Sequence, residues 1–192
     1  MFAAAANASL DAMSSDFQRR KIVAVFSAMD VDGDGFLTEG DFQALTDRWN
    51  GIRGWLPGTE GHEKLTGIMM GWWQTLLAAS DRDRDGKVSL DEVLLVVDEL
   101  HEEPSAVGGT ANAMFDAVDE NGDGEISAAE YRQAIEAWTG RTTDTDDIFP
   151  ILDGNGDGHM SREEFVQLWT EFWAGNDPSA AGSLVFGWVA AH

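Results

Sequence analysis

Apolar residues recur along four stretches of the chain at the three- and four-residue spacing of an amphipathic helix. Before three of these stretches, and once more at Ser89, a Ser or Thr is followed three residues later by Asp or Glu, the pattern of a capping box at a helix start. The periodicity predicts an all-α protein whose helices each bury one face. The apolar positions are Phe42, Leu45, Trp49 and Ile52; Leu65, Ile68, Met69, Trp72 and Leu76; Tyr131, Ile135 and Trp138; and Phe165, Leu168, Trp169 and Phe172.

Four acidic segments of twelve residues interrupt the helical pattern. Each has Asp at position 1, Asp or Asn at 3, Asp at 5, Gly at 6, an apolar residue at 8, Thr or Ser at 9 and an acid at 12. This is the pattern of an EF-hand calcium loop. The segments read DVDGDGFLTEGD (30–41), DRDRDGKVSLDE (81–92), DENGDGEISAAE (119–130) and DGNGDGHMSREE (153–164).

The spacing suits a hard divalent cation that binds about six to eight oxygen atoms. In such a loop, side chains at positions 1, 3, 5 and 12 bind the ion, position 7 uses its backbone carbonyl, and position 9 often acts through water. We expect up to four Ca²⁺ ions, with Mg²⁺ as a second ion. The predicted metal-binding residues are Asp30, Asp32, Asp34, Phe36, Thr38 and Asp41; Asp81, Asp83, Asp85, Lys87, Ser89 and Glu92; Asp119, Asn121, Asp123, Glu125, Ser127 and Glu130; and Asp153, Asn155, Asp157, His159, Ser161 and Glu164.

The first loop departs from this pattern because it ends in Asp41, one methylene shorter than Glu. If this carboxylate reaches the ion through one oxygen only, the lower coordination number suits Mg²⁺. Alternatively, a shifted chain simply binds Ca²⁺ more weakly, and both explanations remain open. In the second loop, Arg82, Arg84 and Lys87 replace no side-chain ligand, so we expect that site to function.

The spacing of the loops predicts how the chain is organised. Position 8 residues Leu37, Val88, Ile126 and Met160 would join the loops in two pairs through short strands. A long insertion, NGIRGWLPGTEGHEKL, separates the first pair, while Pro150 should shorten or kink the helix that enters the fourth loop. Proline and glycine in HEEPSAVGGT break the chain between the pairs. We predict one EF-hand pair over 1–102 and a second over 103–192 with an apolar tail, packed as one compact, two-lobed globule.

The composition of the chain limits the kinds of molecule that it is expected to bind. The formal net charge of -23 disfavours nucleic acid and anionic membranes, so divalent cations are the expected partners. The chain has no cysteine, its start lacks the pattern of a signal peptide, and no stretch approaches the roughly 18 apolar residues of a membrane span. We therefore expect a cytoplasmic monomer. Arginine outnumbers lysine and alanine is abundant, which points weakly to a bacterial source.

Enzyme motifs are incomplete. GHEKLT (61–66) starts like HExxH but has Thr66 where the second His would stand, and HEEPS (101–105) also fails. The chain has neither a GxSxG elbow nor a phosphate-binding Walker loop. The many carboxylates are already explained by metal binding, so we expect no enzyme.

With its long first pair, broken middle and apolar tail, the chain resembles the sarcoplasmic calcium-binding proteins and, among them, the prokaryotic calerythrins. The resemblance covers roughly residues 15–190. It implies a globule whose two EF-hand pairs face each other and which acts as a calcium and magnesium buffer or transporter.

The tail distinguishes this buffer from a calcium sensor. Leu184, Val185, Phe186, Trp188 and Val189 are apolar, and each could contribute about 1.5 to 3 kcal/mol if fully buried. We expect the tail to plug the protein's own core. In the alternative, calcium releases the tail or exposes a groove for a protein target. A remote alternative is a luciferin-binding protein similar to the calcium-triggered photoproteins; the eight Trp suggest it, but the single Tyr speaks against it.

Overall fold

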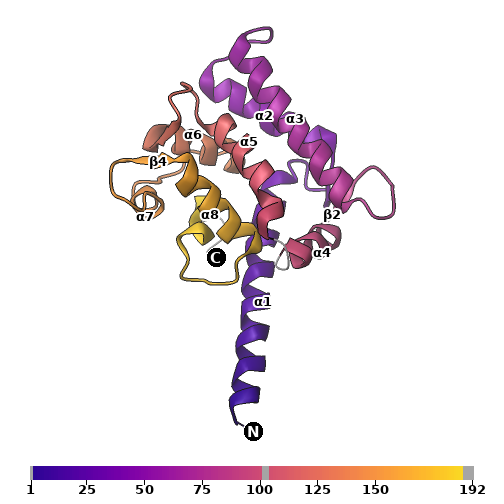
Figure 1. Ribbon diagram of the computed structural model, residues 1–192. Helices are drawn as coiled ribbons and strands as arrows, with labels where there is room; N and C mark the ends of the chain where they lie inside the picture. Colours follow the sequence, from indigo (N-terminus) through magenta and orange to yellow (C-terminus); the bar gives the residue numbers. More distant parts are fainter. Residues whose placement is uncertain (1, 101–103, 188–192) are drawn as a thin grey trace.

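The computed structural model describes residues 2–100 and 104–187, a helical protein with two short strand pairs (Figure 1). This architecture confirms the all-α prediction. In chain order the elements are α1 (Phe2–Met29), β1 (Phe36–Leu37), α2 (Glu39–Arg53), α3 (Glu60–Ser80), β2 (Val88–Ser89), α4 (Leu90–Leu100), the 3₁₀ turn η1 (Pro104–Val107), α5 (Gly108–Val118), β3 (Glu125–Ser127), α6 (Ala128–Thr139), α7 (Phe149–Leu152), β4 (His159–Ser161), α8 (Arg162–Ala174) and the 3₁₀ turn η2 (Ala181–Leu184).

The strands join the four loops in the expected pairs. β1 pairs antiparallel with β2, so that Leu37 faces Val88. β3 pairs antiparallel with β4, so that Ile126 faces Met160. All four position 8 side chains are completely buried. Each strand pair therefore fixes two loops side by side and anchors both to the core.

Two predicted interruptions of the helices are also present. α4 ends at Leu100 and the next regular element begins at Pro104, so no helix of the described chain links the two EF-hand pairs as a rod. α7, which enters the fourth loop, has only four residues, with Pro150 in its first turn. Pro150 lacks a backbone N–H and is tolerated only near a helix start, which explains the short helix. The boundary between 102 and 103 stays a prediction.

One hydrophobic core spans both halves of the chain. Trp72 of α3 lies with its ring centroid 5.5 Å from that of Trp138 in α6 and 6.1 Å from that of Trp169 in α8. Phe42 of α2 packs edge-on to Trp72 at 5.2 Å. Because the contacts of Trp72 with Trp138 and Trp169 cross between the halves, the aromatic side chains hold the two EF-hand pairs against each other.

Three cations from the N-terminal half bind the carboxyl ends of helices in the C-terminal half. Arg53 donates to the carbonyls of Ala117 and Val118 at 2.9 and 2.8 Å, at the end of α5. Arg48 donates to a carbonyl at the end of α6 at 2.9 Å. The ammonium of Lys21 donates to two carbonyls around the end of α8, at 2.8 and 3.0 Å. Helix ends leave carbonyls without intrahelical partners and carry partial negative charge, so each contact stabilises a helix as well as the interface.

The described part of the apolar tail packs inside the protein. Phe186 is 2 % exposed, and its ring centroid lies 4.7 Å from that of Phe172 and 5.5 Å from that of Trp138. Tyr131 donates its hydroxyl to the carbonyl of Leu184 at 3.1 Å. Residues 181–186 therefore belong to the core. The predicted tail residues Trp188 and Val189 lie outside the described residues.

Within the described ranges, no helix is both long and apolar enough to cross a membrane.

Candidate metal centre

Each loop is wound around the side chain at its position 1. In the first loop, one carboxylate oxygen of Asp30 accepts from the backbone N–H groups of Gly33 and Asp34 at 2.9 and 3.1 Å. The other oxygen accepts from Gly35 N–H at 2.9 Å. Asp119 and Asp153 make the corresponding bonds to positions 4 and 6 of their loops at 2.7 to 3.1 Å. These bonds turn the backbone so that the loop closes around one point.

Positions 3 and 5 are aimed by the same kind of contact. Asp32 Oδ1 accepts from the N–H of Asp34 at 3.1 Å, and Asp34 Oδ1 accepts from the N–H of Phe36 at 2.9 Å. The equivalent pair of bonds occurs in the second, third and fourth loops, with Asn in place of Asp at position 3 of the last two. Side-chain oxygens of positions 1, 3 and 5 are thus each tied to the backbone of their own loop.

The acid at position 12 links the two ends of its loop. Glu130 Oε2 accepts from the N–H and hydroxyl of Ser127 at 2.8 and 2.7 Å, while its Oε1 accepts from the N–H of Glu120 at 3.0 Å. Glu130 N–H in turn bonds the hydroxyl of Ser127 at 3.3 Å, which completes the predicted capping box. The same acid therefore starts the exiting helix and carries its carboxylate back to the loop.

Position 7 side chains point toward their partner loop. The ammonium of Lys87 lies 5.0 Å from the ring centroid of Phe36, and Nδ1 of His159 lies 3.5 Å from a carboxylate oxygen of Glu125. These side chains pair across the strands, which leaves only the backbone carbonyl of position 7 as a candidate ligand. Position 9 hydroxyls bond the acid at position 12 in all four loops.

Acidic groups gather most densely in the first two loops. Carboxylate oxygens of Asp30, Asp32 and Asp41 all lie within 4.8 Å of one another, and so do those of Asp81, Asp83 and Asp85. In the first loop the shorter Asp41 still reaches the cluster, and it also accepts from the N–H of Val31 at 2.9 Å. Asp41 is nearly fully buried.

Hydrogen bonds hold two of the carboxylates in the ionised form that binds metal. The backbone N–H of Ser89 keeps the pKa of Glu92 below its ordinary value. The backbone N–H of Glu125 does the same for the pKa of Asp123. Both carboxylates are thus negatively charged at neutral pH, as a cation ligand must be.

Loop 2 differs from the others at position 4. Arg84 adopts a left-handed backbone with φ of 62°, where the other three loops place Gly33, Gly122 and Gly156 at φ of 72 to 74°. For a residue with a Cβ atom this conformation is strained, whereas glycine adopts it freely. The sequence shows the positive charge of Arg84, whereas the left-handed backbone at position 4 is seen only in the structure.

The third loop is supported by Arg53, a contact that the sequence did not predict. Arg53 binds the two carbonyls just before Asp119, and its Nε lies 3.8 Å from a carboxylate oxygen of Glu120. Its side chain is 1 % exposed and comes from the other EF-hand pair. Burial lowers the pKa of Arg53, and the nearby charge of Glu120 opposes that shift.

Parts of the chain match two known domain families. The EF-hand domain pair matches residues 110–170, and the EF hand matches residues 22–46 and 74–97. Together they cover more than half of the chain and include all four predicted loops in full.

Individual proteins are similar as well. The sarcoplasmic calcium-binding protein beta chain of Penaeus sp. is 32% identical over 112 residues, which are 54% of this chain and 57% of that protein's length. A Streptomyces coelicolor calcium-binding protein, whose structure concerns prokaryotic calcium-mediated regulation, is 25% identical, with a TM-score of 0.70 over 82% of this chain and 98% of that one. The calcium-loaded apo form of the coelenterazine-binding protein of Renilla muelleri is 23% identical, with a TM-score of 0.75 over 91% of this chain and 97% of that one, which shows a shared fold. The chain belongs to the EF-hand family, and among its members it is similar to the sarcoplasmic calcium-binding proteins.

Proposed function

We propose that this chain is a cytoplasmic calcium buffer or transporter that binds up to four Ca²⁺ ions, with Mg²⁺ competing most strongly in the loop ending at Asp41. Each ion would be bound by positions 1, 3, 5, 7, 9 and 12 of its loop, as named from the sequence. The observation that carries the proposal is the common geometry of the four loops. In each loop the side-chain oxygens of positions 3 and 5 accept backbone N–H groups of the same loop, and strands join the loops in pairs.

The packed tail favours a buffer over a sensor. A sensor exposes an apolar groove when calcium binds, whereas a buffer keeps its core closed. Here the apolar face of α8 is covered by Phe186 of the same chain, whose ring centroid lies 4.7 to 6.0 Å from those of Trp169, Phe172 and Trp173. Because the tail is part of the same chain, a separate peptide would have to compete with a high effective concentration.

Release of the tail to a protein target remains the second candidate. It is motivated by the similar Streptomyces coelicolor protein, whose structure is described in terms of calcium-mediated regulation. An enzymatic role similar to that of the photoproteins has less support. The single tyrosine, Tyr131, is buried and bonded to the tail, and burial raises its pKa.

ANS fluorescence during a calcium titration separates buffer from sensor. The metal-free protein is titrated with Ca²⁺ in the presence of Mg²⁺ while the dye reports exposed apolar surface. A buffer predicts falling fluorescence, because bound ions tighten the core over the tail. Rising fluorescence would instead show that a groove opens or that the tail is released, and the buffer proposal would be wrong.

A glycine variant calibrates this assay. A Cβ atom at Gly182 would lie 2.4 Å from the backbone oxygen of Leu168, so Gly182→Ala should displace the tail from α8. Gly71→Ala is a matched control, since a Cβ atom there meets nothing within 4 Å. ANS fluorescence in calcium should rise for Gly182→Ala and not for Gly71→Ala. Equal signals from the two variants would mean that the tail does not seal the core.

A further inference from the structure

Three asparagines of the chain directly precede a glycine: Asn50, Asn121 and Asn155. Such a pair is chemically reactive, because glycine has no Cβ atom and its backbone nitrogen can approach the side-chain amide of the asparagine. Asn121 and Asn155 stand at position 3 of the third and fourth loops. Both are exposed, whereas Asn50 lies inside α2 and is 3 % exposed. Water therefore reaches two of the three pairs.

The reaction open to such a pair is loss of the side-chain amide. The glycine nitrogen bonds to Cγ of the asparagine, the Cγ–Nδ2 bond breaks, and the proton of the glycine nitrogen leaves with Nδ2 as ammonia. Water then opens the resulting succinimide ring. Cleavage of the new bond between nitrogen and Cγ gives aspartate. Cleavage of the original peptide bond gives isoaspartate, which has an extra methylene in the main chain.

The third loop restrains both reacting groups of its pair. Gly122 N–H donates to Asp119 Oδ1 at 2.7 Å, and Asn121 Oδ1 accepts from the N–H of Asp123 at 2.8 Å. The glycine nitrogen has to give up its proton in the reaction, and the nearby carboxylate charge opposes that loss. The side-chain carbonyl has to turn toward the glycine, and its bond to Asp123 opposes that turn. The pair is therefore unreactive while the loop keeps this shape.

The fourth loop restrains its pair in the same way. Gly156 N–H donates to Asp153 Oδ1 at 2.8 Å, and Asn155 Oδ1 accepts from the N–H of Asp157 at 2.8 Å. In Figure 1 this loop joins α7 to β4 at the edge of the molecule, and β4 pairs with β3 of the third loop. Each loop can therefore serve as the control for the other.

This restraint depends on a cation. The third loop carries the carboxylates of Asp119, Asp123 and Glu130, and the fourth carries an acid at the same three positions. Without a cation these charges repel one another, so the loop opens more often. A bound ion removes the repulsion and would also hold the side-chain oxygen of Asn121 as its position 3 ligand. An ion in the loop should therefore slow the reaction.

We propose that Asn121 and Asn155 are sites of spontaneous deamidation that a bound divalent ion protects; this inference rests on the proposed ion binding by the loops. The aspartate product gives a loop the residue that the first two loops already have at position 3. The isoaspartate product lengthens the main chain before the glycine, so it displaces the N–H that bonds position 1. The metal-free protein therefore changes its third and fourth sites with time, whereas the loaded protein keeps them.

Peptide mass spectrometry tests the proposal. The full-length protein is kept at neutral pH in excess Ca²⁺ or in chelator, and samples taken over time are digested with trypsin. Electron-transfer dissociation separates aspartate from isoaspartate at each position. In chelator, Asn121 and Asn155 should deamidate at least about tenfold faster than in calcium, the factor expected from losing a hydrogen bond to a charged group. Asn50 should react more slowly than either of them in both conditions.

Equal rates in calcium and chelator, in protein that equilibrium dialysis shows to bind the ions, would overturn the proposal and leave the proposed function intact. Absence of bound ions in that dialysis would instead contradict the proposed function, and this inference with it. If Asn50 reacted as fast as Asn121 in chelator, unfolding of the whole protein rather than opening of a loop would control the reaction, which also overturns the proposal.

Two variants locate the protection in single loops. Glu130→Gln and Glu164→Gln each remove the acid at position 12 of one loop, and glutamine still supports a capping box. In calcium, Glu130→Gln should deamidate at least about tenfold faster at Asn121 and at an unchanged rate at Asn155. Glu164→Gln should show the reverse, so each variant is the matched control for the other. Equal acceleration at both positions in each variant, or no acceleration in either, would contradict protection by the ion in the same loop.

Discussion

Replacing Arg53 with Met should destabilise the protein far more than replacing an exposed arginine. Arg53 supplies two charge-assisted hydrogen bonds to the carbonyls of Ala117 and Val118, and its side chain is 1 % exposed. A hydrogen bond to a charged group contributes about 1.5 to 3 kcal/mol. Met keeps part of the apolar contact with Trp49 and Trp55, whose ring centroids lie 5.1 and 4.8 Å from the guanidinium carbon. The net loss is expected to be about 3 kcal/mol.

Differential scanning calorimetry measures this loss. For a chain of this size, each kcal/mol lowers Tm by about 2 to 4 °C, so Arg53→Met should melt about 6 to 12 °C lower. Arg141→Met, at an exposed position, is the control and should shift Tm by less than about 2 °C. If both variants melted at the same temperature, the contacts of Arg53 would not hold the two EF-hand pairs together.

Three further predictions concern single residues. Arg84→Gly should raise the free energy of unfolding of the metal-free protein by about 1 kcal/mol, because glycine adopts the left-handed backbone without strain. Urea unfolding measures this gain, with Arg82→Gly as the control. An equal free energy of unfolding in the two variants would contradict the prediction. Asp41→Glu should raise the Ca²⁺ affinity of the first loop relative to Mg²⁺, and calorimetric titrations that show unchanged affinities for both ions would refute the role of the shorter side chain. Burial lowers the pKa of Lys21 from 10.5 to about 8, so the unfolded chain binds the proton more tightly. The free energy of unfolding should therefore rise between about pH 8 and 10.5, by at most about 1.4 kcal/mol per pH unit. Lys21→Met should lose this rise, and an identical pH dependence in both proteins would show that Lys21 stays charged without penalty.

The loops and their pairing could be predicted because their chemistry is local. Twelve consecutive residues contain the ligands, the turn and the helix cap, so the pattern predicts the capping box that joins Ser127 and Glu130. The strand pairing of Leu37 with Val88 follows from the apolar residue at position 8 of each loop. Pro150 also acts locally, and the short α7 is the result.

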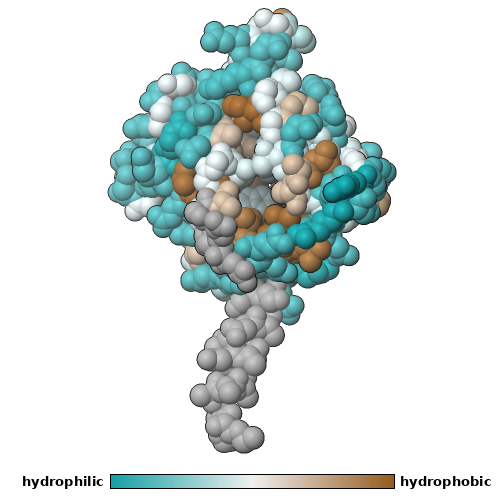
Figure 2. All heavy atoms as spheres, turned by 45° about the vertical axis from the view of Figure 1, so that its right-hand side comes forward, coloured by the Kyte–Doolittle hydropathy of each residue, from teal (hydrophilic) through white to brown (hydrophobic). Residues whose placement is uncertain are grey.

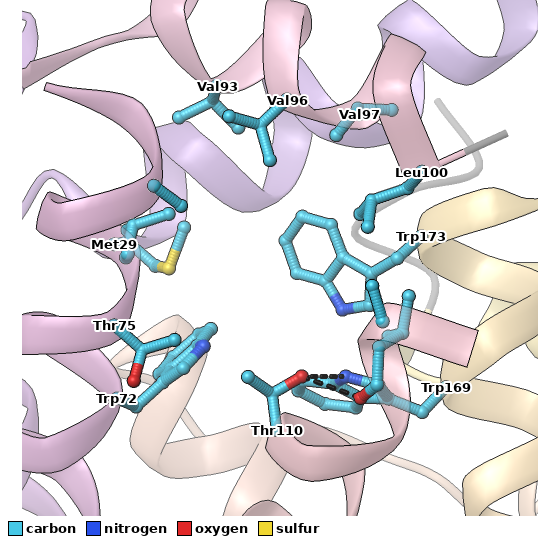
Figure 3. Close-up of a pocket in the computed structure, with 14 residues that line it drawn as sticks. Met29, Trp72, Thr75, Val93, Val96, Val97, Leu100, Thr110, Trp169 and Trp173 are labelled. Carbon is cyan, nitrogen blue, oxygen red and sulfur yellow. Dashed lines mark hydrogen bonds between the residues drawn. The ribbon is translucent and has the colours of Figure 1, made fainter. Parts of the chain in front are cut away.

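The contacts between the two halves could not be predicted in the same way. Lys21 and its partner Phe172 are 151 residues apart, and Arg53 and Ala117 are 64 apart. From the sequence alone, these cations look like ordinary surface charges on amphipathic helices. Only the three-dimensional arrangement shows that they meet carbonyls at helix ends. An apolar cavity of about 210 Å³ between the two EF-hand pairs (Figure 2) has the same origin, since its walls come from six elements of the fold (Figure 3).

Equilibrium dialysis against radioactive calcium tests the central claim most directly. The unmodified protein should bind four Ca²⁺ ions per chain at saturation without Mg²⁺. Glu130→Gln and Glu164→Gln should each reduce this number by one, because the acid at position 12 provides two of the oxygens. Binding of fewer than two ions per chain, or an unchanged number in both variants, would contradict the assignment of these loops as calcium sites.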